Sequence, residues 1–182
     1  MPHGDPHMST SAATLATDHP TSTAATVRAG LVGGAIAGIA FAMFEMMAAA
    51  VLNGPDAFFM PLRMIGAIGL GASALDPSSS LVTAGAVGLV IHMALSMMYG
   101  LVVALVASGV TSIRRTTGSL VAFASAAGFA LWILNFFLLA GALGWSWFPD
   151  SQNAAVQFAA HTVMFGSVLG LLLDRLAFRA TR

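Results

Sequence analysis

Four long apolar runs constrain the fold of this chain more than any other feature. They cover residues 29–53, 81–110, 118–144 and 153–173. Each run reaches the roughly 20 residues that a helix needs to cross about 30 Å of hydrocarbon. A segment in lipid must satisfy every backbone N–H and C=O group internally, so runs of this kind form helices. The sequence therefore predicts an all-α integral membrane protein, built as a four-transmembrane-helix bundle.

The composition agrees with a lipid environment. Charged residues make up 8% of the 182 residues and apolar residues 58%, whereas soluble domains carry about 25% charged residues. The formal net charge is zero, so the chain has no basic footprint for a nucleic acid. Cysteine is absent, which excludes disulfides, thiolate metal sites and cysteine nucleophiles. The lipid bilayer is the expected partner, and a nucleic acid is not.

Two segments outside the apolar runs have a distinct character. Residues 1–27 are rich in Ser, Thr, Ala and Pro without an apolar period, which predicts a disordered tail ahead of a membrane domain at 28–182. His3, His7 and His19 are scattered in that tail, and we interpret them as solvated residues. Between the first two spans, residues 54–80 have an apolar middle from Pro61 to about Leu75. It is too short to span, so we expect an interfacial or re-entrant helix, either a lid or a surface helix.

The arginines predict the orientation, because basic residues favour the cytoplasmic side of a membrane. With four spans, Arg63 alone falls on one side of the membrane. The six arginines on the other side are Arg28, Arg114, Arg115, Arg175, Arg179 and Arg182. Both termini are therefore expected in the cytoplasm.

Small residues recur at helical spacing in the first two spans. Such residues let helix backbones approach closely in lipid. The expected packing positions are Gly30, Gly34 and Gly38 in the first span, and Gly85, Gly88 and Gly100 in the second. A tightly packed bundle follows from this pattern.

Each span also carries one strongly polar side chain: Glu45, His92, Asn135 and His161. Glu45 is seven residues after Gly38 and continues the small-residue stripe, so it faces the bundle. At 1.5 Å per residue, the four side chains lie roughly 11 to 17 Å from the outer ends of their spans. The sequence predicts that they meet in one polar site in the outer half of the membrane. Supporting polar residues are Ser96, Arg63 and Gln157.

A carboxylate within a membrane costs at least ~2.5 kcal/mol unless it is paired or neutralised, so it is a candidate functional residue. Glu45, His92 and His161 could handle a proton, or they could bind zinc, iron or manganese. Copper is a further candidate because methionines lie nearby in the sequence, at Met43, Met46, Met47, Met93, Met97 and Met164. Haem b between the two histidines is less favoured, since small residues bring these helices close together. A structural hypothesis stays open, in which a Glu45–His92 hydrogen bond orients the bundle.

Several short motifs resemble the YagU-like family of small bacterial inner-membrane proteins. They are "PLRMIGAIGLGASALDPSSS", "IHMALSMMYG", "FAAHTVMF" and "LLLDRLAFR". The positions that carry the resemblance are Glu45, Arg63, Asp76, Pro77, His92, Ser96 and His161. It implies a four-span protein of the bacterial inner membrane. Where that family is expected to have a third-span histidine, this chain has Trp132 or Asn135, a departure that bears on any family metal site.

Two functions from different classes follow from the sequence. In the first, Glu45, His92 and His161 handle a proton or bind a metal in the outer leaflet. In the second, the chain is a structural accessory subunit of a larger respiratory, photosynthetic or oxygenase complex, or it associates with itself. The chain has no serine-centred elbow and no H-E-x-x-H helix, so the residues favour a role other than hydrolysis and lean away from an enzyme.

Overall fold

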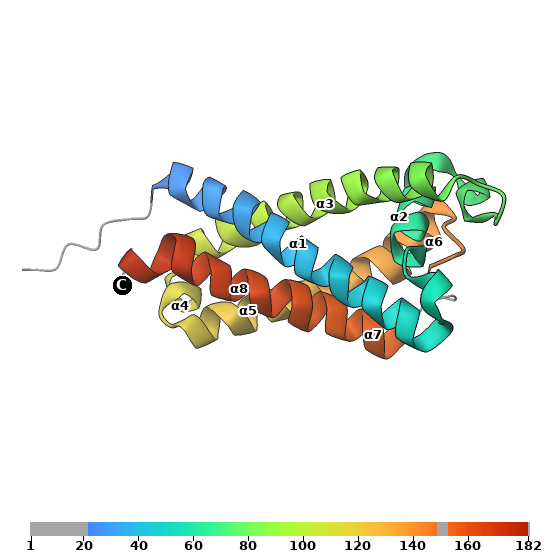
Figure 1. Ribbon diagram of the computed structural model, residues 1–182. Helices are drawn as coiled ribbons and strands as arrows, with labels where there is room; N and C mark the ends of the chain where they lie inside the picture. The colour runs from blue at the N-terminus through green and yellow to red at the C-terminus, as the bar shows by residue number, and fades with distance from the viewer. Residues whose placement is uncertain (1–21, 149–152, 182) are drawn as a thin grey trace, which may run out of the picture.

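The computed structural model describes residues 22–148 and 153–181, and every regular element in these two ranges is helical (Figure 1). Four helices in this part of the chain are long and apolar enough to cross a membrane: Thr23–Asn53, Leu81–Gly109, Thr117–Leu143 and Ala154–Phe178. The predicted all-α class and the four long apolar helices are therefore confirmed.

The first long helix is α1 (Thr23–Asn53) and the second is α3 (Leu81–Gly109). The third is continuous through α5 (Thr117–Ile133), η3 (Leu134–Leu139) and α6 (Ala140–Leu143). The fourth runs through α7 (Ala154–Ala159), η4 (Ala160–Ser167), α8 (Val168–Leu173) and η5 (Asp174–Phe178). Shorter elements are η1 (Pro55–Ala57), α2 (Met60–Leu70), η2 (Ala72–Leu75), α4 (Thr111–Arg114) and η6 (Arg179–Thr181). The segments η3, η4 and η5 are π-helical.

The start of α1 corrects one prediction. The helix begins at Thr23, inside the segment to residue 27 that the sequence predicted to be disordered. Ser22 caps it, because its side chain accepts a hydrogen bond from the backbone N–H of Ala25 at 3.2 Å, as serine commonly does before a helix. The rest of the predicted tail, with its three histidines, lies outside the described residues.

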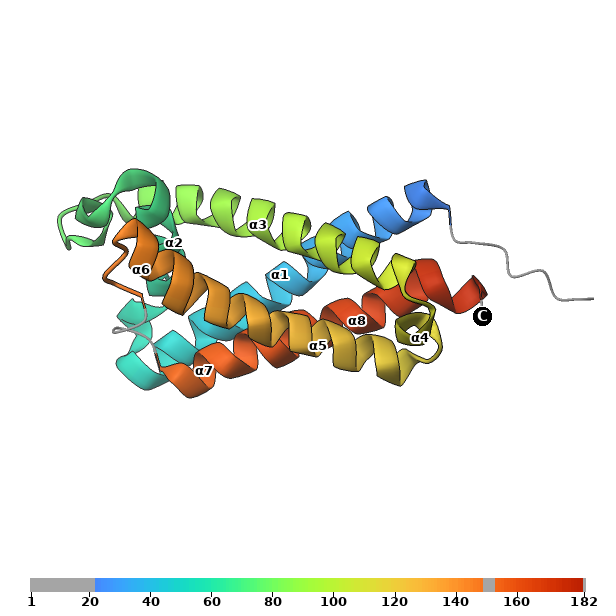
Figure 2. The same ribbon diagram turned by 180° about the vertical axis from the view of Figure 1, so that it is seen from behind.

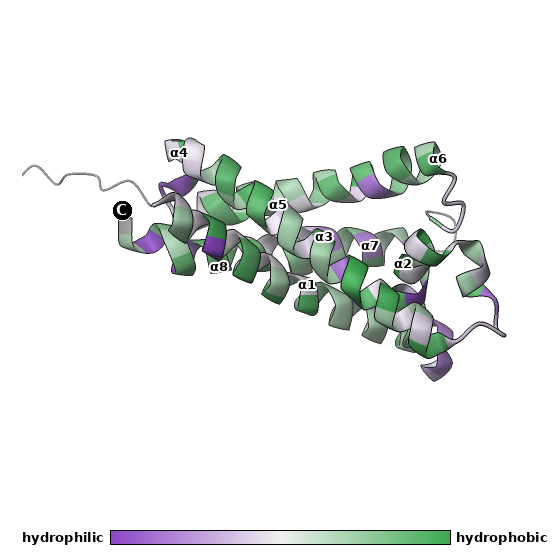
Figure 3. Ribbon diagram, turned by 90° about the horizontal axis from the view of Figure 1, so that it is seen from above, coloured by the Kyte–Doolittle hydropathy of each residue, from purple (hydrophilic) through white to green (hydrophobic). Residues whose placement is uncertain are grey.

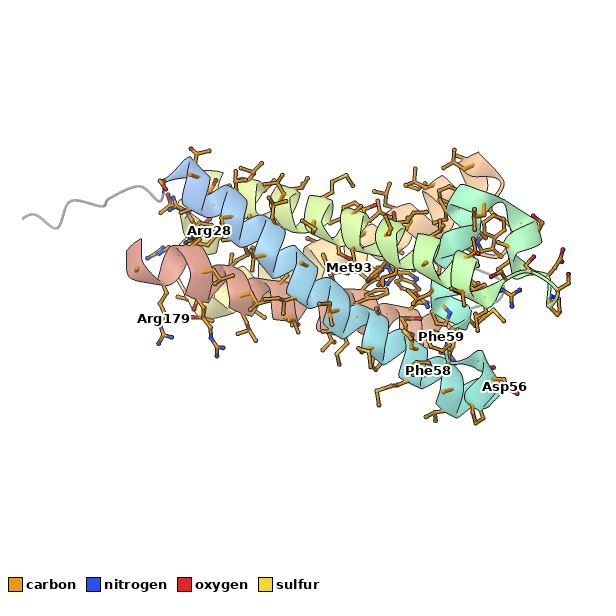
Figure 4. All side chains as sticks on the ribbon, turned by 45° about the horizontal axis from the view of Figure 1, so that its top comes forward. Arg28, Asp56, Phe58, Phe59, Met93 and Arg179 are labelled. Atoms are coloured by element: carbon orange, nitrogen blue, oxygen red, sulfur yellow. The ribbon has the colours of Figure 1, made fainter. Side chains whose placement is uncertain are left out.

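The two ends of the bundle differ. The start of α1, the C-terminal η6 and α4 lie together at one end, here called the α4 end (Figures 1 and 2). At the other, the α2 end, lie α2, α6 and the segment 144–148. Arg28 and Arg179 lie at the α4 end, whereas Asp56 and Phe58 lie at the α2 end (Figure 4). Hydrophilic residues gather toward both ends, and apolar residues dominate the long helices between them (Figure 3).

Helices α1 and α3 approach closely at their small residues. A Cβ atom added to Gly30 would lie 2.7 Å from the Cα atom of Leu101, and one added to Gly38 would lie 2.6 Å from the Cβ of Ser96. Gly34 and Gly100 face each other across the same contact. These contacts are closer than any side chain allows, so these glycines occupy the packing face that the sequence predicted.

One of the glycines predicted to pack in the second span, Gly85, does not do so. Gly88 packs against the carbonyl group of Leu62 in α2, but an added Cβ at Gly85 would meet no atom within 4 Å. Ala84 beside it is buried instead. The prediction of Gly85 as a packing residue is wrong, because α2 crosses α3 one residue away from the expected face.

The predicted short helix between the first two long helices is present as α2. At 11 residues it is too short to cross a bilayer, and it packs across α3 at the α2 end of the bundle (Figure 1). It ends at Leu70 instead of continuing to Leu75, since Gly71 has φ = 84°, a left-handed conformation that favours glycine. A separate turn, η2, follows.

Candidate functional site

A cavity of about 260 Å³ lies inside the bundle toward the α2 end, and it is partly open. We call it the bundle cavity. Its polar lining consists of Glu45, His92, Ser96, Tyr99, Asn135, Gln157 and His161. Its aromatic lining, apart from Tyr99, consists of Phe41, Phe136, Trp145, Phe148 and Phe165. The structure thus brings to one cavity the four polar residues, one from each long helix, that the sequence singled out.

Glu45 is the carboxylate among these residues. It is 4% exposed, and its Oε2 accepts a hydrogen bond from the Nε2–H group of Gln157 at 2.8 Å. Its Oε1 is buried and has no hydrogen-bond partner. The hypothesis of a Glu45–His92 pair is therefore wrong, because the fourth helix supplies the partner of Glu45.

The two histidines donate to backbone carbonyl groups. His92 Nε2 lies 2.8 Å from the carbonyl oxygen of Gly38, and His161 Nδ1 lies 2.9 Å from that of Gln157. A carbonyl oxygen can only accept, so each of these ring nitrogens carries a hydrogen. In the neutral ring the other nitrogen, Nδ1 of His92 and Nε2 of His161, is then an acceptor. Gly38 makes the first bond possible because it lacks a side chain at the crossing of α1 and α3.

Aromatic rings pack directly against this polar group. The ring centroid of Phe41 lies 5.2 Å from that of His92 and 4.7 Å from that of His161. Phe136 contacts His161 on another side, with centroids 5.6 Å apart, and Phe148 lies 5.0 Å from Phe136. His161 is consequently held between two rings, and His92 packs against one.

Asn135 is held by a residue that the sequence reasoning missed. The hydroxyl group of Tyr99 donates to Asn135 Oδ1 at 2.9 Å, which joins α3 to η3 where these helices otherwise barely touch. Tyr99 is seven residues after His92 and three after Ser96, so helical spacing places it on the same face as both. That spacing was the available signal. Phe41, four residues before Glu45, and Phe165, four after His161, have the same kind of signal.

Arg63 does not belong to the site. Its Nε donates to the carbonyl oxygen of Ala74 at 2.7 Å, and its other hydrogen bonds reach the carbonyl groups of Asp76 and Ser79. It does not line the bundle cavity. The prediction of Arg63 as a supporting residue of the site is wrong, since its side chain holds the segment 74–79 against α2.

Two of the three π-helical segments named above, η3 and η4, contribute to the cavity wall. Segment η3 carries Asn135 and Phe136, and η4 carries His161 and Phe165. A π-helical turn contains an extra residue, and such turns occur frequently at functional sites. Gly128 lets α5 approach the carbonyl group of His161 within η4. Nothing in the sequence indicated these turns, which set the direction of the side chains that follow them.

The residues present do not fit a metal ion. Across residues 22–148 and 153–181, no group of three His, Asp or Glu side chains lies close enough to hold one. None of the six methionines near the site in sequence lines the bundle cavity, and Met43 and Met47 are 46% and 57% exposed. Haem does not fit either, because the cavity of about 260 Å³ lies below the roughly 300–1,000 Å³ of pockets for drug-sized ligands.

A second buried carboxylate lies at the α4 end, far along the fourth helix from the cavity. Asp174 is 3% exposed, and its Oδ2 accepts a hydrogen bond from the hydroxyl group of Thr117 at 3.0 Å. This contact joins the start of α5 to η5. The sequence reasoning did not select Asp174, because it follows the last apolar run and resembles an ordinary residue of the membrane boundary.

No family model, no curated protein and no solved structure matches this chain. The resemblance to the YagU-like family therefore stays a prediction, and the function has to be argued from the geometry of the cavity.

Proposed function

We propose that this chain is a multi-pass protein of the bacterial inner membrane, with both termini in the cytoplasm, whose Glu45 site binds and releases a proton near the outer face. One observation carries the proposal. Glu45 is buried between apolar helices, its partner is a neutral amide, and one of its two carboxyl oxygens has no partner at all. A neutral amide orients a carboxyl group but supplies no opposing charge.

A proton supplies the charge that the site lacks. An ionised carboxylate in hydrocarbon is costly, and protonation of Oε1 removes that cost while it leaves the bond between Oε2 and Gln157 in place. His92 and His161 each keep one acceptor nitrogen in the neutral ring, as their bonds to carbonyl groups require. Glu45 and two neutral imidazoles on one cavity form a set of groups that can accept a proton in turn.

The cavity also offers a route for the proton. It runs from these groups to Pro61 in α2 and to Trp145 and Phe148 in the segment that follows α6, and it is partly open. These residues lie at the α2 end, which carries Arg63, whereas Arg28 and Arg179 lie at the α4 end (Figure 4). The positive-inside rule favours a periplasmic position for the α2 end, toward which the cavity extends.

The test uses the fact that Glu45 is the sole glutamate of the chain. Protein labelled with ¹³C at the glutamate side-chain carboxyl group, in lipid nanodiscs, should give one resonance from residue 45. We expect this resonance to move reversibly with pH and to be missing in Glu45→Gln. A resonance that stays unchanged between pH 4 and pH 10 would overturn the proposal.

Orientation is tested separately with single cysteines, which the chain otherwise lacks. Ser78 and Ser112 are both exposed, the first at the α2 end and the second in α4. An impermeant maleimide should label Ser78→Cys in intact cells. It should label Ser112→Cys only after the cells are lysed. The reverse pattern would show that the α2 end faces the cytoplasm.

A further inference from the structure

The bundle cavity combines a carboxylate oxygen without a partner and a wall of aromatic rings. Glu45 lines the cavity, and its Oε1 is buried without a hydrogen-bond partner. Phe41, Phe136, Phe148 and Trp145 line the same space. Aromatic faces attract cations, and a buried carboxylate attracts a cation that can also donate hydrogen bonds. Each feature alone is common in helical bundles, but their presence in one cavity points to a specific kind of ligand.

We propose that the bundle cavity binds a small organic ammonium ion with an aromatic or alkyl tail, which takes the place of the proton on Glu45. This inference rests on the proposed function, because the ammonium ion and the proton compete for the same carboxyl group. The N–H groups of the ion would donate to the Glu45 carboxylate. Its tail would lie along the apolar side chains toward α2, where Ile65 and Ile68 line the cavity.

The charges around the cavity suit a cation better than an anion or a neutral alcohol. No arginine is among the described residues that line it, and the chain has no lysine. The titratable groups that line the cavity together with Glu45 are His92 and Tyr99 from α3 and His161 from η4. Since His92 and His161 already donate to carbonyl groups, their free nitrogens in the neutral state accept hydrogen bonds. The NH₂ group of Asn135 is a donor in the wall, but it is neutral.

The size of the cavity limits the ligand. A volume of about 260 Å³ admits a single ring with a short chain and excludes large polycyclic cations. Phenethylammonium is therefore a suitable probe. 2-Phenylethanol has the same ring and chain length with a hydroxyl group in place of the ammonium group, so it serves as a matched neutral control.

The experiment titrates each probe into the ¹³C-glutamate protein at the pH where Glu45 is half protonated. Phenethylammonium should move the single resonance toward its ionised position and reach saturation, whereas 2-phenylethanol should leave it in place. At pH values more than one unit below the midpoint of the Glu45 titration, the apparent Kd of phenethylammonium should rise roughly tenfold for each further unit of pH decrease, because the proton competes for the carboxylate. By calorimetry, Glu45→Gln should weaken binding at least roughly tenfold, as expected for loss of a hydrogen bond to a charged group.

Asp56→Asn is the matched control, since it removes a carboxylate that is exposed at the α2 end, and it should bind as the wild type does. Equal affinity for the amine and the alcohol, or full binding by Glu45→Gln, would overturn the inference. A resonance that follows pH but ignores the amine would also overturn it and would leave the proton function intact. A resonance that ignores pH would refute the proton function and the exchange together. Comparison of the two probes on wild-type protein decides the matter even if Glu45→Gln does not fold.

Discussion

Replacement of Gly34 by alanine should separate α1 from α3. A Cβ atom at this position would meet the carbonyl oxygen of Ser96 and would lie 3.1 Å from the Cα atoms of Met97 and Gly100. All three obstacles are backbone atoms, so no side-chain rotation can relieve them and the helices must move apart. Overpacking of this kind costs about 1–3 kcal/mol, and Gly34→Ala should lower the free energy of unfolding by that amount.

The control is Gly85→Ala, the same substitution in a long helix at a position where an added Cβ meets nothing within 4 Å. It should leave stability unchanged or raise it slightly, because alanine favours helices over glycine. Unfolding is followed by circular dichroism during titration of dodecyl sulfate into mixed micelles. The reasoning is refuted if both variants unfold at the same detergent fraction, or if Gly85→Ala is the less stable of the two.

Two further predictions concern single contacts, and a third concerns metal binding. Tyr99→Phe removes the hydrogen bond to Asn135 and should lower the free energy of unfolding by about 0.6 kcal/mol, the average for such bonds in bilayers; the same detergent titration measures it. Arg63→Ala frees the carbonyl groups of the segment 74–79, so hydrogen exchange there should accelerate while the cavity residues stay protected; unchanged exchange would show that Arg63 is dispensable. Chelation with EDTA should leave the melting temperature unaltered, because no three-ligand group was found among the described residues; a fall would show a metal that this geometry does not accommodate.

The periodicity of small residues was enough to predict which way Glu45 faces. Gly30, Gly34 and Gly38 mark the closest approach of α1 to α3, and Glu45 continues their face. The depth of each polar side chain followed from its distance to the end of an apolar run, which is why all four reach one cavity. The facing and the depth of a side chain are local properties of a single helix, so they can be predicted from the sequence of that helix.

The partners across helices could not be predicted in the same way. Gln157 meets Glu45 from 112 residues away, and their contact depends on how the fourth helix is rotated and placed. The π-helical segment that begins at Ala160 changes that rotation without any signal in the residue types. Gly85 shows the same limit on a smaller scale, since its spacing matched the packing face but the crossing of α2 uses Gly88 and Ala84.

The near absence of contact between α3 and α5 has a consequence for how the chain is made. Helix α1 packs against α3 on one side and against η4 and α8 on the other, whereas α5 packs chiefly on the fourth long helix. Two helical hairpins can therefore form one after the other during synthesis. In the first, α1 packs on α3, and in the second, α5 packs on the fourth long helix. In the first hairpin, one side of α1 stays uncovered until η4 and α8 have been synthesised. Because Glu45 receives Gln157 only when the fourth long helix packs on α1, its carboxyl group should stay open to water or to a chaperone until that helix has been synthesised.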